Sequence, residues 1–353
     1  MNRSIQLLII MVIAVSCVKI SDPVTNDPVK SFVTPNTVFI INEGNFGWGN
    51  GSLSYFSYDS AKIYNDIFRT INKRTMGDVP YSMLVYGNNA YIVINNSEKI
   101  EVIDRRTLES KTTITGFISP RNIIVAADDK AYVSSMYSDS VTIVDLKKNK
   151  ISGYVNIHKT SEAMVKKDGK VFVSNWIGGN EIFIINTETD KLTDSIEVGI
   201  EPESMALDKN GILWVLCNGG WTRENYAELV GINQNTHEKV KRFIFPSKLN
   251  SPLNLMADGN GDTLYYIDDG IRRMDITADE LPSVPFIDKS DHLIYKLGIN
   301  PVNGDIFLTD AVDYQQNGYV IIYNNKGILR SRYQTGIIPG AICFMVESGS
   351  LTE

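Results

Sequence analysis

A repeat of about 40 to 45 residues constrains the fold of this chain more than any other feature of its sequence. Four segments, "IEVIDRRTLESKTTI", "VTIVDLKKNKISGYV", "IFIINTETDKLTDSI" and "LVGINQNTHEKVKRF", share an alternating apolar stretch, Asp or Asn, a polar turn and a second stretch. The acid or amide recurs at spacings of 41, 41, 47 and 42 residues, at Asp104, Asp145, Asn186, Asn233 and Asp275. A period of two, with β-branched and aromatic residues in "AYIVI" and "VFVSN", indicates strands and excludes a helical solenoid.

A second marker is a proline that opens a short apolar run in most units. It occurs at Pro80, Pro120, Pro202, Pro252 and Pro339, and Ser161 and His292 take the equivalent place in the two other units. Each unit therefore predicts four short strands, which is typical of a β-propeller blade. Residues 38–344 hold seven such units. We predict a single all-β domain, a seven-bladed β-propeller of four-stranded antiparallel blades.

The two ends of the repeat region predict how the ring closes. The chain enters at "TVFIINEG", which matches the second strand of a blade and has no proline run before it. It finishes with "IPGAICF", which matches a first strand and has no blade after it. The C-terminal strand, at about 339–344, is therefore expected to complete the first blade and so remove two exposed sheet edges. We expect the propeller to span residues 36–346, followed by a C-terminal tail over 347–353.

The N-terminus has the pattern of a targeting segment. "MNRS" carries one Arg, "IQLLIIMVIAV" is apolar but too short to span a bilayer, and "SC" follows. A Cys directly after a small residue resembles the bacterial lipoprotein signal. This predicts a lipoprotein signal peptide over 1–16 and a lipid on Cys17, with ordinary secretion and an incidental Cys as the alternative. Residues 17–35, polar and with three prolines after Cys17, are expected to be a flexible tether.

One face of the predicted propeller should carry most of the aromatic loops. In a four-stranded blade, the loop between the second and third strands and the connection to the next blade emerge on the same side, which we call the loop-bearing face. Its expected aromatic residues are Phe46, Trp48, Tyr137, Trp176, Trp221, Tyr226 and Tyr314. Residues that follow the blade-opening proline, Tyr81, Arg121, Glu203 and Leu253, should ring the mouth of the central channel.

An aromatic patch rimmed by polar residues usually marks an interaction site. We therefore predict that the seven aromatic residues, together with Tyr81, Arg121 and Glu203, bind a ligand. The alternative is that the rings only pack between loops and stabilise them.

The sequence contains no motif of a nucleophile elbow, a zinc protease or a phosphate loop. His158 and His292 lie near carboxylates and could act in acid–base chemistry, or they could be solvated loop residues. Acids that could converge on the channel, as in metal-dependent lactonase propellers, are Glu43, Glu162, Glu203, Asp268 and Asp310. We predict a non-enzyme without catalytic residues, a metal site or a cofactor. The net charge of -7 and the lack of a basic block exclude nucleic acid as a partner.

The repeats "AYIVIN" and "VFVSNW", followed by "VIDRRTLE" and "VDLKKNK", resemble those of the YncE-like seven-bladed propellers over nearly all of residues 38–344. The opening "INEGNFGWGNGSLSYFSYDS" behind a lipoprotein signal is similar to that of the surface lipoprotein propellers of Bacteroidetes. The best-understood members of that group capture cobalamin and sit as a lid on a TonB-dependent outer-membrane transporter.

The resemblance implies a lipid-anchored protein of the outer membrane, at the cell surface or facing the periplasm. It also implies that the loop-bearing face binds cobalamin or a related corrinoid and delivers it to the transporter. Two alternatives use the same architecture: a surface propeller that binds a glycan or a peptide, and a metal-dependent lactonase or lyase.

Overall fold

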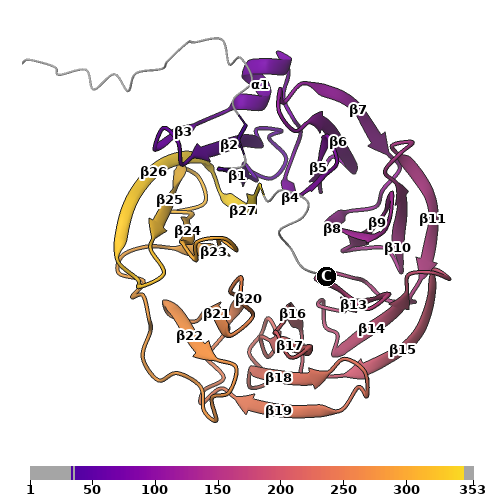
Figure 1. Ribbon diagram of the computed structural model, residues 1–353, viewed down its shortest axis with the longest axis vertical. Coiled ribbons are helices and arrows are strands. Elements are labelled where there is room, and N and C mark those ends of the chain that lie inside the picture. Colours follow the sequence, from indigo (N-terminus) through magenta and orange to yellow (C-terminus); the bar gives the residue numbers. More distant parts are fainter. Residues whose placement is uncertain (1–32, 35, 346–353) are drawn as a thin grey trace, which may run out of the picture. The chain divides into compact units, whose positions relative to one another are not determined.

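The computed structural model describes residues 33, 34 and 36–345, and these form seven antiparallel sheets arranged as the blades of a ring (Figure 1). The predicted all-β, seven-bladed propeller is therefore confirmed. The expected signal peptide, the lipidated Cys17 and the tail 347–353 lie outside the described residues. No helix of the described part has the length and apolar character needed to cross a membrane.

The first four blades each contain four strands, ordered from the channel outwards. In the first blade these are β27 (Pro339–Phe344), β1 (Thr37–Asn42), β2 (Ser52–Ser57) and β3 (Lys62–Tyr64). In the second they are β4 (Pro80–Tyr86), β5 (Asn89–Ile94), β6 (Lys99–Asp104) and β7 (Ser110–Thr115). In the third they are β8 (Pro120–Ala127), β9 (Lys130–Ser135), β10 (Ser140–Asp145) and β11 (Lys150–Asn156). In the fourth they are β12 (Met164–Lys167), β13 (Lys170–Ser174), β14 (Glu181–Asn186) and β15 (Lys191–Glu197).

The last three blades differ in strand number. The fifth has β16 (Pro202–Leu207), β17 (Ile212–Cys217), β18 (Glu228–Asn233) and β19 (Lys239–Ile244). The sixth has only β20 (Leu253–Ala257), β21 (Thr263–Ile267) and β22 (Ile271–Asp275). The seventh has β23 (Ile294–Ile299), β24 (Ile306–Asp310), β25 (Asn317–Tyr323) and β26 (Leu329–Ile337).

The missing outer strand of the sixth blade has a local cause. After β22 the chain returns along "LPSVPF", and only Ile287 makes a ladder bridge, to Ile271. Pro282 and Pro285 lack the N–H that a ladder needs, so the outer position is filled by an irregular segment rather than by a strand. The four-stranded pattern therefore holds in six of the seven sheets.

The ring closes as the sequence predicts. Strand β27 pairs antiparallel with β1, with Val38 opposite Phe344 and Ile41 opposite Ala341. The last strand of the chain is thus the innermost strand of the first blade, next to the first strand of the chain (Figure 1). This pairing covers the inner edge of β1, which would otherwise be exposed.

The repeated Asp or Asn has a structural role at the end of each third strand. The Asp104 carboxylate accepts a hydrogen bond from the Arg106 N–H, and the Asn186 side chain accepts one from Glu188 N–H. Asp145, Asn233 and Asp275 accept equivalent backbone bonds. Such Asx turns fix the turn that follows the third strand in the second to sixth blades, which explains why the marker recurs in the sequence.

Apolar clusters lie between neighbouring blades and are built from the second and third strands. Ile92, Ile184 and Val215 are fully buried representatives. A short helix that the repeat does not predict, α1 (Ile67–Asn72), packs Ile67 and Phe68 against the cluster of the first two blades.

Candidate functional site

The channel-side strand of most blades begins with a shift in register. In β4 the shift lies between Pro80 and Ser82, and in β16 between Pro202 and Ser204. A bulge leaves one residue outside the ladder and redirects its side chain. The residues freed in this way are Tyr81 and Glu203, which the sequence placed at the channel mouth.

Equivalent positions in the seven blades form a ring, which we call the mouth ring. In order around the channel from the seventh blade, its members are Tyr295, Gly340, Tyr81, Arg121, Glu162, Glu203 and Asn254. Each member lies beside the end of a second strand, so the mouth ring shares its face with the loops that follow those strands.

Two sequence assignments in the mouth ring are wrong. In the sixth blade Leu253 pairs with Ile267, just as Pro202 pairs with Cys217 in the fifth. Leu253 therefore takes the place of the proline, and Asn254 is the member of the mouth ring. In the seventh blade Ile294 takes that place, because it pairs with Asp310; His292 lies two residues earlier. Both errors arise because bulge positions depend on strand pairing rather than on the proline.

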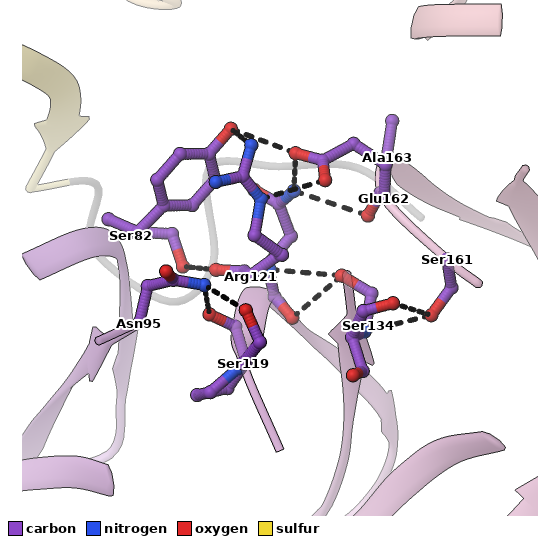
Figure 2. A network of polar contacts seen from close by, with 12 residues as sticks. Ser82, Asn95, Ser119, Arg121, Ser134, Ser161, Glu162 and Ala163 are labelled. Atoms are coloured by element: carbon purple, nitrogen blue, oxygen red, sulfur yellow. Dashed lines mark hydrogen bonds and ion pairs between the residues drawn. The ribbon is translucent and has the colours of Figure 1, made fainter. Parts of the chain in front are cut away.

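The mouth ring contains a largely enclosed hydrogen-bonded triad of Tyr81, Arg121 and Glu162, drawn from three successive blades. Figure 2 shows Arg121 and Glu162 of this triad. The Arg121 guanidinium lies 3.6 Å from the centre of the Tyr81 ring and stacks on it. Its Nε donates to Glu162 Oε2 at 2.8 Å and its Nη2 to the Tyr81 hydroxyl at 2.6 Å. The Tyr81 hydroxyl donates in turn to Glu162 Oε1 at 2.8 Å.

Burial and charge fix the protonation of Arg121 and Tyr81. The Arg121 and Glu162 side chains are only 12% and 7% exposed. Burial alone would lower the pKa of Arg121, but Tyr81 and Glu162 outweigh it and raise that pKa above its ordinary value. Burial, followed by the Glu162 charge, raises the pKa of Tyr81 well above 10.0. Arg121 therefore remains a cation and Tyr81 a neutral donor.

The connections between blades hold the triad in place. Ser82 Oγ donates to the carbonyl of Arg121 at 2.6 Å. Asn95, just after β5, donates from Nδ2 to Ser119 Oγ and to the Pro120 carbonyl, each at 3.0 Å (Figure 2). Because these bonds cross from the second blade to the third, the backbone under Arg121 is fixed by its neighbour.

A second cluster adjoins the triad on the side of the seventh blade. The Tyr295 hydroxyl donates to Glu43 Oε1 at 3.0 Å, and the Tyr314 ring meets the Tyr295 ring edge-on at 5.7 Å. Burial raises the pKa of Glu43, while Lys296 and the Tyr295 hydroxyl act in the opposite direction. Burial and Glu43 together raise the pKa of Tyr295. The Lys296 Nζ lies 5.8 Å and 5.6 Å from the centres of the Tyr81 and Tyr295 rings.

The aromatic residues of the loops surround the mouth ring and are arranged very differently. Trp221 is 88% exposed, Trp48 78% and Phe46 74%. Three further aromatic residues predicted on the loop-bearing face are also exposed: Tyr137, Tyr226 and Tyr314. Among the aromatic residues of the described part that are exposed, Tyr154 alone lies elsewhere, on outer strand β11.

Trp176 is the exception among the predicted aromatic contacts. It is partly buried, and its ring centre lies 5.8 Å from the Arg121 guanidinium carbon. Its buried Nε1 has no hydrogen-bond partner within the described residues. Trp176 therefore links the mouth ring to the loops instead of presenting a free ring.

The loop "NEGNFGWGNG" joins β1 to β2 and is tied at both sides. Gly47 N–H donates to Asp78 Oδ2 at 2.8 Å, and Asn45 Nδ2 donates to the Tyr314 carbonyl at 2.9 Å. Gly44, Gly47 and Gly49 adopt positive φ angles of 74°, 82° and 62°. These left-handed conformations suit glycine and bring the Phe46 and Trp48 rings to the surface.

The loop-bearing face also holds a cleft between the third and fourth blades. Its volume is about 390 Å³, and its lining includes Tyr137, His158, Thr160, Ile177 and Asn180. Aromatic, apolar and amide groups thus converge here.

The acids considered for metal binding are already engaged. Asp268 accepts from the Asn250 amide, Asp310 lies 2.8 Å from His292 Nδ1, and Glu203 accepts from the Asn254 N–H. No group of three or more His, Cys, Asp or Glu side chains suited to a metal ion occurs in residues 33–34 and 36–345.

Sequence reasoning missed Tyr295 and Lys296. "LIYKLGI" has the same form as "VPYSMLV", a Tyr just before an apolar run, but without the proline that marks the other blades. The Tyr before the apolar run could therefore have identified Tyr295 as the member of the mouth ring in the seventh blade.

Comparisons with known proteins give a family and a fold. The family model described as a domain of unknown function, DUF5074, matches residues 36–336. No curated protein matches the chain in sequence.

Solved structures similar to the chain have low sequence identity. A quinonprotein alcohol dehydrogenase-like protein from Bacteroides thetaiotaomicron VPI-5482 has 15% identity and a TM-score of 0.70, covering 88% of this chain and 78% of that chain. Hydrazine synthase of Kuenenia stuttgartiensis has 14% identity and a TM-score of 0.64, covering 74% and 88%. Virginiamycin B lyase from Staphylococcus aureus has 15% identity and a TM-score of 0.57, covering 72% and 83%. At these identities the likeness shows the fold alone.

Proposed function

The chain belongs to the DUF5074 family, whose function is unknown, and we propose that this member is a non-enzymatic ligand-capture propeller. It binds cobalamin or a related corrinoid on the loop-bearing face. A lipid on Cys17 anchors it to the outer membrane at the cell surface, and it delivers the ligand to a TonB-dependent transporter.

The one-sided distribution of exposed aromatic residues carries this proposal. Phe46, Trp48 and Trp221 each expose about three quarters or more of their surface on the loop-bearing face. Exposed aromatic surface of this extent is costly in water unless a partner covers it, and aromatic residues gathered on one face usually mark an interaction site. The packing alternative requires these rings to be covered by other loops, and their exposure argues against it.

The chemistry of the face suits a large, flat ligand with many amide groups. Aromatic rings provide stacking surface, and Asn, Gly and Ser in the same loops provide backbone and side-chain hydrogen bonds. A corrin ring with amide arms needs both kinds of contact. The opening "INEGNFGWGNG", similar to that of surface lipoprotein propellers, adds the expected location.

Isothermal titration calorimetry of the purified protein with cyanocobalamin tests the proposal. We expect saturable binding that is weakened by Trp48→Ala and left unchanged by Tyr154→Ala, because Tyr154 is exposed on an outer strand away from the face. Absence of binding at micromolar concentration would rule out the corrinoid.

The cleft between the third and fourth blades favours a second candidate, a glycan ligand. Tyr137 offers a stacking surface beside the Asn180 amide and the Thr160 hydroxyl, in a volume that suits a single sugar ring. A glycan array would test this candidate. If the protein binds one class of glycan and the Tyr137→Ala variant does not, the glycan is favoured over the corrinoid.

A further inference from the structure

Lys296 is a cation at the channel mouth that no carboxylate of the described residues neutralises by direct contact. Its Nζ borders the Tyr81 and Tyr295 rings at 5.8 Å and 5.6 Å, yet within the described residues it forms no ion pair or hydrogen bond. Cation–π contacts partly stabilise such an ammonium group while leaving its three donors available.

Arg121, unlike Lys296, is paired with a carboxylate. Both cations lie against the same Tyr81 ring, but Glu162 pairs with Arg121 through an ion pair of 2.8 Å. Glu43 is the carboxyl whose pKa the Lys296 charge lowers, but its Oε1 accepts a hydrogen bond from the Tyr295 hydroxyl at 3.0 Å and makes no ion pair with Lys296. Burial raises the pKa of Glu43 and so favours its uncharged form. Neither Glu162 nor Glu43 therefore pairs directly with the Lys296 ammonium group.

Gly340 leaves room for the Glu43 carboxyl beside this cation. The first blade lies between the seventh and second blades, and its member of the mouth ring has no side chain. A Cβ at Gly340 would collide with the Glu43 carboxyl, which fills the space on that side. Beside that carboxyl, the Lys296 Nζ reaches to 5.8 Å from the centre of the Tyr81 ring of the second blade.

From this arrangement we infer that Lys296 binds an anionic group of the captured ligand, a phosphate or a carboxylate, at the channel mouth. The inference rests on the proposed capture of a ligand by the loop-bearing face. A Lys ammonium is a compact point charge suited to an oxyanion, and its bonds to one are charge-assisted. The anionic group sits above the Tyr81 and Tyr295 rings, while the loop aromatics hold the rest of the ligand.

Calorimetric titrations of the full chain with inorganic phosphate and, separately, with acetate test the inference and distinguish the two oxyanions. We expect saturable binding of one of them. Lys296→Met should weaken it by at least about tenfold, the loss of one charge-assisted bond, while Lys296→Arg should stay within about threefold. Lys159→Met is the matched control, because Lys159 is an exposed lysine of the same face in the third–fourth blade cleft, and it should change nothing.

The inference is overturned if neither anion binds saturably, if Lys296→Met binds as tightly as the wild type, or if Lys159→Met loses as much affinity. A parallel titration with cyanocobalamin separates it from the proposed function. If anion binding depends on Lys296 but cyanocobalamin does not bind, the anion site is supported and the corrinoid proposal is contradicted. If Lys296→Met leaves cyanocobalamin binding unchanged, the corrinoid proposal is supported and the role of Lys296 in binding the captured ligand is contradicted.

Discussion

The mouth ring and the loops that surround it lie on one face, yet they are built in opposite ways. In the mouth ring, Tyr81, Arg121 and Glu162 are largely enclosed and satisfy one another's hydrogen bonds. In the loops, Trp48 and Trp221 keep most of their surface in water. Groups that are enclosed and paired lose much when one partner is removed, whereas exposed rings contribute little to folding. The difference predicts that the enclosed triad mainly stabilises the fold, whereas the exposed loop rings serve mainly the proposed ligand binding.

Removing the charge of Glu162 should have the largest effect on stability. Glu162→Gln leaves the buried Arg121 guanidinium without its counter-ion, and breaking a buried pair in this way costs about 3 kcal/mol or more. Urea denaturation followed by circular dichroism would measure the loss. Glu109→Gln, at an exposed turn, is the control and should stay within about 0.5 kcal/mol. Equal stabilities for Glu162→Gln and the wild type would show that the mouth ring is not a stabilising element.

Truncating the exposed loop rings should separate binding from stability. Trp48→Ala and Trp221→Ala are each expected to weaken cyanocobalamin binding by about tenfold, since a stacked ring contributes about 1 kcal/mol or more. Their unfolding free energies should change by no more than about 0.5 kcal/mol, because both rings are mostly exposed. A large loss of stability with unchanged binding would instead favour the packing alternative.

The smallest expected effect is a pH dependence that arises from Glu43. Because burial raises its pKa in the folded state, the folded protein holds this proton more tightly than the unfolded chain, whose value is near 4.5. The stability that Glu43 contributes is therefore fully present below pH 4.5 and is lost as pH rises through the folded pKa. Thermal unfolding should show Glu43→Gln gaining stability relative to the wild type as the pH increases from 4.5. A constant difference across that range would contradict the raised pKa.

The fold could be predicted because its signals are local and repeated. Asp104 and its four counterparts mark the turn after the third strand of a blade by bonding to the backbone two or three residues later. The incomplete units at the two ends of the repeat, which contain Val38 and Phe344, identify the closing strands. Helix α1 and the proline-rich return through Pro282 and Pro285 interrupt the repeat once each, so no second copy reveals them.

The candidate site could be predicted only in part. Tyr81, Arg121 and Glu203 follow a proline and were placed correctly in the mouth ring, whereas Asn254 and Tyr295 depend on where a strand shifts register. The pairing of Arg121 with Glu162 joins residues of different blades, and one sequence does not specify which channel-side residues meet. The exposure of a ring could not be predicted from the repeat either: Trp176, like Trp48, lies in the loop between the second and third strands of its blade, but it packs beside Arg121.

Hydroxyl-radical footprinting tests the central claim most directly, because it reports the solvent access of individual aromatic rings with and without cyanocobalamin. We predict that the ligand lowers the oxidation rates of Trp48 and Trp221 several-fold and leaves that of Tyr154, on outer strand β11, unchanged. Equal oxidation of Trp48 and Trp221 with and without a bound ligand would contradict recognition by the loop-bearing face.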